Sequence, residues 1–384
     1  MLISHISDLH LGYAQFGLEE REDDIYQSFN EAIDVSIKEG VRAVILAGDL
    51  FHSPRPSGKA IITLGNALKK LKESNIAAAF VLGEHDISRL RDVPFAYLFS
   101  NLGLAKRLRL DEPLVVDNCV IFGENKERRS NIDSLIDRLR NVRTGQHEGR
   151  KKILVLHQGL TDLNKFAGEM NATDLPPGFD YYALGHYHDH VEKCFDFLGG
   201  LLAYPGSLDL TPSEGIKETD KGFIIADLSR QETTTHWIRL EQMRKQFSIR
   251  INYAEMANEM TRIFDKAKAS NNGKKPVARI EVSGLDIDPR TVAASLVRLN
   301  NYCLHYVWQP VEEGRPGATA YDSRPADMDS ELYRLSAKAL ESEELAQFAI
   351  EEILPLSANG DAGAVLDLVW EAYRSKRFGK DVSK

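Results

Sequence analysis

Short apolar runs alternate with longer amphipathic stretches along the first part of the chain. Each run is bounded by polar or turn residues, which predicts buried strands at 2–7, 44–47, 77–82, 153–156 and 181–184. Apolar residues recur at helical spacing over 25–40 and 58–74, and 87–104 is also expected to be helical, with a break at Pro94. Strands that alternate with helices predict an α/β domain.

The pattern becomes β-rich in the next stretch. Residues 201–204 and 222–227 are apolar strands, and a turn at 205–207 follows the first of them. Alternating strands and helices followed by hairpins predict a two-layered β-sandwich flanked by helices, so the fold class is α/β. The composition changes near Gln246, and we therefore expect a first domain at 1–246.

The rest of the chain divides into three segments. Residues 247–313 follow a β-α-β-α-β pattern of small-domain size. A stretch with glycine and proline at 314–327 is expected to be a linker. Residues 328–384 are expected to form an acidic helical tail. Its second helix has an apolar stripe at i, i+3, i+4, i+7 and i+8, made by Val365, Leu368, Val369, Ala372 and Tyr373.

Composition limits the class of protein. A chain of 384 residues with 43% hydrophobic and 27% charged residues is typical of a soluble globular protein with two or three domains. No apolar run approaches about 18 residues, so no membrane span is expected. Three cysteines, far apart and odd in number, favour reduced thiols in a cytoplasmic protein. The net charge of −9 argues only mildly against nucleic-acid binding, because a local basic patch can bind phosphates.

Metal-ligating side chains follow each of five predicted strands. They are Asp8, His10, Asp49, Glu84, His85, His157, His186 and His188. Open α/β sheets bind ligands at the carboxyl ends of strands, and residues i and i+2 of a strand face the same side. These oxygen and nitrogen donors, without a thiolate, suit Mn, Fe or Zn. Seven ligands are too many for one ion, so we predict two ions roughly 3.5–4 Å apart that bind a phosphate and activate a water.

Each of these motifs is weak when it is taken alone. A single histidine at a strand end is usually only a polar loop residue. That interpretation also covers most of His5, His52, His147, His190, His236 and His305, although His52 could have a role. Repetition of one construction at five strand ends favours a metal site over coincidence.

Five motifs stand in a fixed order: Asp-x-His at 8–10, Gly-Asp at 48–49, Gly-x-His-Asp at 83–86, His157, and Gly-His-x-His at 185–188. In order and spacing they resemble the calcineurin-like metallophosphoesterase superfamily. The longer strings at 7–12, 48–52 and 204–207 resemble more specifically the meiotic-recombination-eleven family of DNA double-strand-break repair nucleases, in an archaeal-type length. The resemblance covers the first domain well and extends to the small domain and the tail.

The resemblance implies a role for each motif residue. The first metal would be held by Asp8, His10, Asp49 and His188, with Asp49 bridging. The second would be held by the Glu84 position, His157 and His186. His85 would donate a proton to the leaving oxygen or stabilise the transition state, and His52 would help position the DNA end. Asp86 is expected to orient the loop. The implied cofactor is a pair of Mn²⁺ ions.

The implied protein is a hydrolase, a DNA exonuclease and single-strand endonuclease that acts on DNA ends with a coiled-coil SMC-like ATPase. The small domain would be a DNA-binding cap, and the tail would dock the ATPase. A homodimer would form through the helices at 58–74 and 87–104. Their apolar positions exceed what sheet packing needs, although ordinary burial is the alternative: Ile61, Leu64, Leu68, Leu71, Leu90, Tyr97 and Leu98. Candidate phosphate contacts, which could equally be solvated surface, are Arg55, Arg89, Lys274 and Lys275.

Glu84 departs from the family pattern, which has asparagine at this position. Glutamate adds one negative charge and one methylene, so the ligand set carries −3 and not −2 against +4 for two ions. We expect tighter metal binding and a less acidic bound water, with tolerated variation as the alternative. Two other functions stay open. One is a phosphodiesterase for a small or nucleotide substrate, and the other is a DNA-end-binding scaffold whose catalysis Glu84 weakens.

Overall fold

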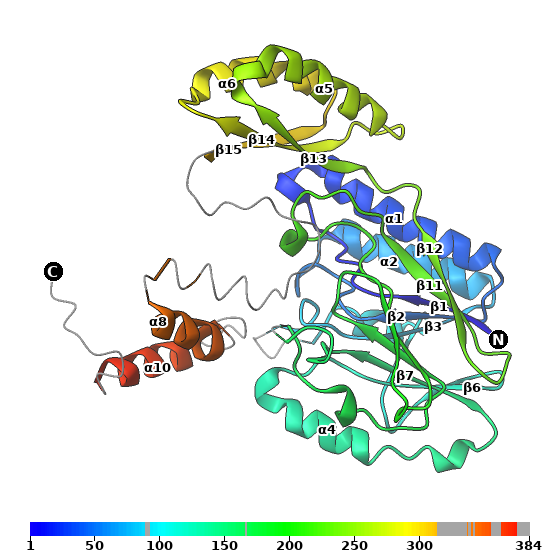
Figure 1. The fold of residues 1–384 in the computed structure, drawn as a ribbon. Helices are drawn as coiled ribbons and strands as arrows, with labels where there is room; N and C mark the ends of the chain where they lie inside the picture. The colour runs from blue at the N-terminus through cyan, green and yellow to red at the C-terminus, as the bar shows by residue number, and fades with distance from the viewer. Residues whose placement is uncertain are drawn as a thin grey trace.

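Two six-stranded sheets lie face to face in the computed structural model, with helices on their outer faces (Figure 1). The structure describes residues 1–88, 93–165, 167–312, 336, 339–340, 342–354 and 362–374. This arrangement confirms the two-layered α/β class. None of the described helices is long and apolar enough to span a membrane.

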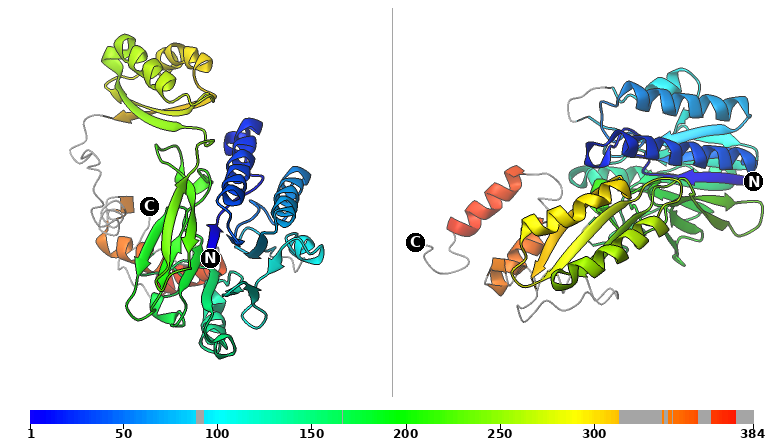
Figure 2. Two further views of the ribbon diagram at one scale, coloured as in Figure 1. Left: turned by 90° about the vertical axis from the view of Figure 1, so that its right-hand side faces the viewer. Right: turned by 90° about the horizontal axis from the view of Figure 1, so that it is seen from above.

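The first sheet has the strand order β12-β11-β1-β2-β3-β4. Its strands are β1 (Leu2–Ile6), β2 (Ala43–Ala47), β3 (Ala77–Val81), β4 (Lys106–Arg107), β11 (Gly222–Asp227) and β12 (Thr234–Arg239). Strands β1 to β4 are parallel, and β11 pairs antiparallel with β1. Two long helices cover the outer face, α1 (Glu19–Lys38) and α2 (Gly58–Glu73), and they lie side by side in Figure 2.

The second sheet has the order β5-β6-β7-β8-β10-β9. Its strands are β5 (Leu114–Val116), β6 (Cys119–Glu124), β7 (Lys151–His157), β8 (Tyr181–Gly185), β9 (Val191–Cys194) and β10 (Leu201–Tyr204). Helix α4 (Ile132–Arg140) packs on its outer face.

Strand β2 shows why the sequences of the inner strands are continuous apolar runs. Val44 and Leu46 pack against the helices, whereas Ala43, Ile45 and Ala47 pack into the layer between the two sheets. A strand that is buried on both faces has no polar side, so its sequence does not alternate.

A smaller three-stranded parallel sheet has its own hydrophobic core. It consists of β13 (Gln246–Asn252), β14 (Val277–Gly284) and β15 (His305–Glu312), and α5 (Met256–Ala269) and α6 (Pro289–Leu296) cover one of its faces. Figures 1 and 2 show these helices on the side turned away from the two-sheet core. The expected small domain occupies this stretch, and its limits at 247 and 313 stay a prediction.

The prediction of a helix at 87–104 is wrong for most of the described residues in this range. Only α3 (Tyr97–Asn101) is helical there, and 93–96 are not. Pro94 disfavours the helical conformation in the residue before it, so the helix starts only after the proline. Leu90 lies outside the described residues.

The apolar stripe of α2 was also misinterpreted. Leu64, Leu68 and Leu71 are at most 1% exposed in the core beneath the helix, and Ile61 packs against the same core. The stripe is therefore the face that packs on the sheet, and none of these four residues is left over for a partner. The exposed apolar side chain of this helix is Ile62.

The tail is described only in part. Two of its helices are α8 (Glu343–Phe348), continued by a π-helical turn at Ala349–Ile353, and α10 (Ala362–Arg374). On α10 the predicted stripe is exposed only in part. Val369 and Tyr373 are exposed, Val365 and Leu368 are half-buried, and Ala372 is buried. The large exposed apolar side chains of this helix are Leu366, Val369, Trp370 and Tyr373. The expected linker at 314–327 lies outside the described residues.

Candidate metal centre

The loops that follow β1, β2, β3, β7 and β8 meet at one edge of the sandwich and bring the predicted ligands together. The ligand atoms lie within 4.8 Å of one another inside each of several groups. One group is Asp8, His10 and His188, and another is Glu84, His157 and His186. Asp49 belongs to groups with Asp8 and His157 and with Glu84 and His85, so it lies between the two halves of the centre.

Four of the predicted ligands have backbone angles that L-residues rarely adopt. The φ angle is 51° at Asp8, 46° at His10, 49° at Asp49 and 101° at His186. Such conformations cost on the order of 1–3 kcal/mol each and persist only when surrounding contacts impose them. Backbone bonds impose them here, from Asp8 N to Gly48 O at 3.1 Å and from His10 N to Asp49 O at 2.9 Å. Strain that coincides with the predicted ligands favours a functional centre.

Two glycines of the motifs are required by close packing. A Cβ on Gly48, where φ is +91°, would lie 2.2 Å from Nδ1 of His157. A Cβ on Gly83 would lie 2.1 Å from Oδ1 of Asp49. Any larger residue at either position would displace a predicted ligand.

Hydrogen bonds on the outer side of the histidines fix which ring nitrogen faces the centre. Nδ1 of His157 lies 2.7 Å from Ala47 O and must donate to it. Nδ1 of His188 lies 2.7 Å from Thr211 Oγ1, which itself donates to Glu214 at 3.0 Å and therefore accepts from the histidine. In both residues Nε2 therefore faces the centre. Metal-binding histidines are commonly oriented in this way, by a hydrogen bond from the ring nitrogen that does not bind the metal.

The carboxylates control the charge of the histidines. Burial lowers the pKa of His157, but Asp49 and Glu84 outweigh burial and raise this pKa well above its usual value. Its Nε2 lies 2.9 Å from Glu84 Oε2 and 3.4 Å from Asp49 Oδ2. Burial lowers the pKa of His10 to about 3, so His10 is neutral and offers a lone pair. Three carboxylates and four imidazoles around one point suit two divalent ions, and a metal would replace the proton on His157 Nε2.

Lys126 is a neighbour that sequence reasoning missed. Its Nζ lies 3.8 Å from Glu84 Oε2, 2.5 Å from Glu169 Oε1 and 3.4 Å from His186 Nδ1, and its side chain is only 7% exposed. This ammonium group partly offsets the additional charge that Glu84 brings to the centre. Lys126 belongs to none of the motifs, so no local signal could have identified it.

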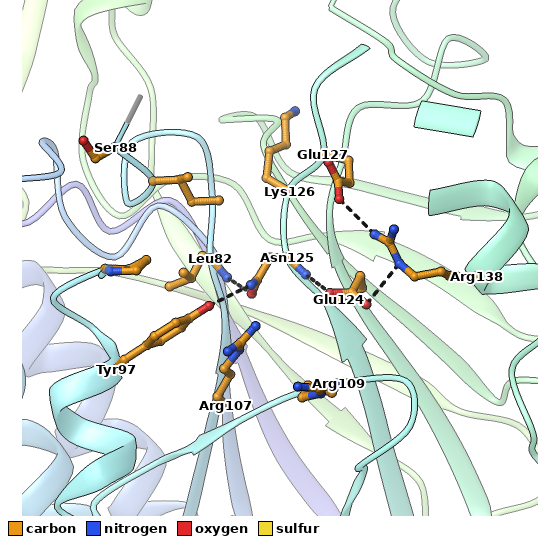
Figure 3. A pocket seen from close by; sticks show the side chains of 12 residues that line it. Leu82, Ser88, Tyr97, Arg107, Arg109, Glu124, Asn125, Lys126, Glu127 and Arg138 are labelled. Carbon is orange, nitrogen blue, oxygen red and sulfur yellow. Dashed lines mark hydrogen bonds and ion pairs between the residues drawn. The ribbon is translucent and has the colours of Figure 1, made fainter. Parts of the chain in front are cut away.

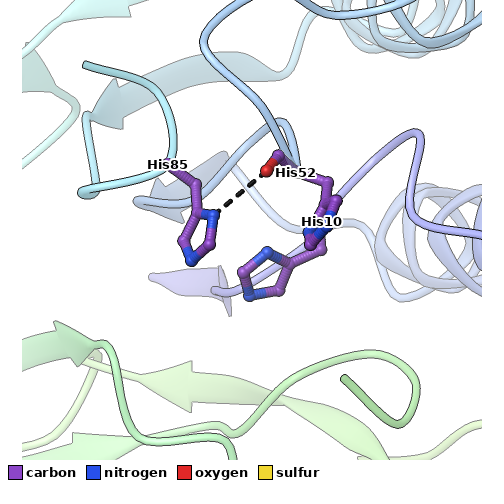
Figure 4. A group of neighbouring side chains, drawn as sticks. All are labelled: His10, His52 and His85. Carbon is purple, nitrogen blue, oxygen red and sulfur yellow. Dashed lines mark hydrogen bonds between the residues drawn. The ribbon is translucent and has the colours of Figure 1, made fainter. Parts of the chain in front are cut away.

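His85 lies beside the ligands and is fixed by the loop after β2 (Figure 4). Its Nδ1 lies 3.0 Å from the carbonyl oxygen of His52, and its ring stacks on the His52 ring at 5.4 Å. The ring of His10 is 4.9 Å away. Since Nδ1 donates to a carbonyl, Nε2 of His85 is the nitrogen that remains for a substrate.

Asp86 ties two of these loops together. Its carboxylate accepts backbone hydrogen bonds from Leu50 at 3.1 Å, Phe51 at 2.9 Å and Gly83 at 2.9 Å. Burial raises the pKa of Asp86 to about 7 against these bonds. This is the geometry expected of a residue that orients the loop.

The candidate DNA contacts lie in different environments. Arg55 is exposed in the loop after β2, and Lys275 is exposed in the small domain. Lys274 is 17% exposed, and its Nζ lies 2.9 Å from Asp24 Oδ1 and 2.6 Å from Gln242 O. It is thus held by the first domain in this structure. Arg89 lies outside the described residues.

A buried ionic network joins the small domain to the metal centre, and the sequence did not reveal it. Arg21 is fully buried and binds Asp24 at 2.5 Å and Asp209 at 2.7 Å. Asp24 also binds Arg244 at 2.6 Å, two residues before β13, and Arg244 donates to Lys275 O of the small domain at 2.6 Å. Asp209 stands two residues before Thr211, which orients His188. The network therefore fixes the base of the small domain and one wall of the centre.

Comparison with known proteins identifies the setting of this centre. Residues 1–190 match the family described as calcineurin-like phosphoesterase. The DNA double-strand break repair protein Mre11 of Sulfolobus acidocaldarius is 32% identical over 80% of this chain and 81% of that protein. The protein of the same name from Sulfurisphaera tokodaii is 33% identical over 79% of each chain. Among solved structures, a dimetal phosphatase from Danio rerio matches 62% of this chain and 96% of its own, with a TM-score of 0.44 and 14% identity.

Proposed function

Because the chain belongs to the Mre11 family of calcineurin-like phosphoesterases, we propose that it is a two-metal DNA nuclease of double-strand-break repair. It is a metal-dependent phosphoesterase and thus a hydrolase. The finer assignment includes exonuclease and single-strand endonuclease activity, Mn²⁺ as the metal, and action with a coiled-coil ATPase on DNA ends.

One observation carries the proposal. Asp8, His10, Asp49, Glu84, His157, His186 and His188 converge from five strand ends, with Asp49 between the two groups. Two divalent ions bound there would supply Lewis-acid stabilisation of a phosphodiester and a more acidic water. The donor set suits two ions without a thiolate, and the outer hydrogen bonds of His157 and His188 keep Nε2 of both rings on the inner side.

The residues of the chain divide the chemistry between them. His157 and His188 keep Nε2 toward the centre through their bonds to Ala47 O and Thr211. His85 lies beside the ligands, and its Nδ1 donates to His52 O, so Nε2 faces the substrate. With the ring in its imidazolium form, Nε2 can donate its proton to the departing sugar oxygen and is left with a lone pair. His52 stacks on His85 and thereby sets the position of that ring. Hydrolysis breaks the bond from phosphorus to this sugar oxygen while water adds to phosphorus.

Two apolar surfaces support the proposed assembly. Ile62 of α2, Leu98 of α3, and Phe95 and Leu102 beside α3 are 43–64% exposed, which suits a homodimer interface at these helices. On α10 the residues Leu366, Val369, Trp370 and Tyr373 follow the i, i+3, i+4, i+7 spacing of a helix that lies in a partner groove. These four residues are the proposed contact with the ATPase.

A nuclease assay tests the proposal. Labelled duplex and hairpin DNA is incubated with the parent and with His85→Ala, each in Mn²⁺, Mg²⁺ or chelator. We expect cleavage with Mn²⁺, none with chelator, and a loss of about 10²–10⁴-fold in kcat for His85→Ala, because general acid catalysis contributes that much. Mn²⁺ titration of the variant is the control, since His85 is not assigned as a ligand.

Other outcomes separate the alternatives. Hydrolysis of a chromogenic diester without any cleavage of DNA would select a small-molecule phosphodiesterase. Binding of duplex ends without Mn²⁺-dependent cleavage would select a DNA-end-binding scaffold.

A further inference from the structure

A second polar cavity lies beside the metal centre and is not used by the mechanism above (Figure 3). It has a volume of about 550 Å³ and lies where the loop after β3, α3, β4 and the end of β6 meet. Lys126 lines it and also contacts Glu84 and His186, so the cavity adjoins the second-metal group. A substrate strand bound at the centre has this cavity next to it.

The cavity is lined by more positive than negative groups, in a chain whose net charge is −9. Most of the cations are already paired. Arg109 binds Asp111 through two bonds of 2.8 Å, Arg138 binds Glu127 at 3.0 Å, and Lys126 binds Glu169 at 2.5 Å. Arg107 is the exception, because it forms no ion pair with any described residue.

Arg107 is held in place, but its side chain forms no hydrogen bond with the residues that the structure describes. Its guanidinium carbon lies 4.2 Å from the centre of the Tyr97 ring, and its Nε is buried without a partner. A buried donor without a partner has lost its bonds to water without replacement, so such a group needs an explanation. A ring-stacked guanidinium with unused N–H groups is suited to bind an oxyanion at two points.

The neighbours of Arg107 present donors to the same cavity. Leu82 N donates to Asn125 Oδ1 at 3.0 Å, which fixes the amide with Nδ2 toward the Tyr97 hydroxyl at 3.2 Å. The Tyr97 oxygen accepts that bond, so its O–H proton remains for a ligand. Leu82, Ile87 and Pro94 supply apolar surface on the same wall. Donors that point to one place beside apolar surface suit a phosphate with its sugar.

We propose that Arg107, with Tyr97 and Asn125, binds the phosphate of a nucleotide adjacent to the scissile bond. This inference rests on the proposed function, since it takes the bound strand to be DNA. It extends that function by giving the enzyme a preference for a strand with a neighbouring phosphate over an isolated diester. Arg107 is a substrate-binding residue in this account and takes no part in the proton transfers.

Equilibrium binding of short nucleotides tests the subsite. Thymidine dinucleotides with no terminal phosphate, a 5′-phosphate or a 3′-phosphate compete against fluorescein-labelled oligothymidylate in Mn²⁺. Each dinucleotide carries a phosphorothioate linkage that slows hydrolysis. In the parent, one phosphorylated form should bind about tenfold more tightly than the unphosphorylated form, as expected for one charge-assisted pair near the surface. In Arg107→Ala this ratio should fall below twofold.

Three variants separate a specific contact from general effects. Arg107→Lys should retain only part of the ratio, because lysine keeps the charge but not the planar fork. Tyr97→Phe should lower the ratio less than Arg107→Ala, since the ring under Arg107 stays. Arg42→Ala is the control: it removes one positive charge from the segment before β2, where Arg42 binds Asp117 at 2.9 Å, and should keep the full ratio. Thermal unfolding checks that each variant is folded, and Arg107→Lys carries the test if Arg107→Ala does not fold.

The inference is overturned if the parent shows no preference for a terminal phosphate, or if the preference survives in Arg107→Ala. Cleavage of DNA by the parent in Mn²⁺ is measured in parallel. A phosphate preference without cleavage would contradict the proposed function and leave the subsite standing. Cleavage without a phosphate preference would support the proposed function and contradict the subsite.

Discussion

Replacement of Glu84 by asparagine should weaken metal binding at the group formed with His157 and His186. A divalent ion among these ligands lies closer than 4.8 Å to each ligand atom, because that distance bounds their separation. At that range one unit charge interacts with a 2+ ion by about 2 kcal/mol in a water-like dielectric and about 7 kcal/mol at an effective dielectric of 20. The Glu84 side chain is 39% exposed, so the lower figure applies, and the amide oxygen of asparagine can still ligate. We expect roughly 30-fold weaker binding of the second ion, which corresponds to that lower figure.

Removal of the Lys126 charge should have the opposite effect on metal binding. Its Nζ is 3.8 Å from Glu84 and repels a bound cation, so Lys126→Gln should tighten binding of the same ion several-fold. Glu84→Gln removes the charge but keeps the chain length, and it should behave like Glu84→Asn if charge is the cause. Calorimetric titration with Mn²⁺ measures both ions in each variant. The reasoning is refuted if Glu84→Asn binds the second ion as tightly as the parent, or if Lys126→Gln binds it more weakly.

Two further predictions concern stability and assembly. Burial raises the pKa of Glu214, but Lys221 at 2.6 Å outweighs burial and lowers it to about 2 from 4.5. A depressed pKa stabilises the fold by about 3 kcal/mol above pH 4.5, and this contribution is lost as the pH falls toward 2. Between pH 5 and pH 3.5 the parent should therefore lose about 1 kcal/mol more than Glu214→Gln in denaturant unfolding, and equal losses would argue against the pair. Leu98→Glu should convert a dimeric parent into a folded monomer in light scattering, because Leu98 is 44% exposed; a dimeric variant would place the interface elsewhere.

The sequence could predict which side chains meet at this edge of the sheet because its signals are local. A buried strand that ends in Gly48 and Asp49, or in Gly83 and Glu84, puts a donor at the carboxyl edge of the sheet whatever the rest of the chain does. The fold class followed from the same alternation of strands and helices. The strained backbone at Asp8 and His10 has no sequence signal of its own beyond the residue types that tolerate it.

The features that the sequence did not reveal depend on contacts between distant segments. Lys126 contacts His186 across 60 positions of the sequence, and Lys274 binds Asp24 across 250. For Lys274 the sequence suggested a phosphate contact or a solvated surface cation. Periodicity also could not say which partner a helix face meets. The stripe of α2 with Leu64 and Leu68 packs on its own sheet, and it resembles the pattern of an interface helix equally well.

The central claim is that seven side chains from five strand ends hold two metal ions. Anomalous scattering from crystals grown with Mn²⁺ tests it most directly. We predict two peaks roughly 3.5–4 Å apart, one beside Asp8, His10 and His188 and one beside Glu84, His157 and His186, with Asp49 contacting both. A single peak, or peaks away from these residues, would contradict the account.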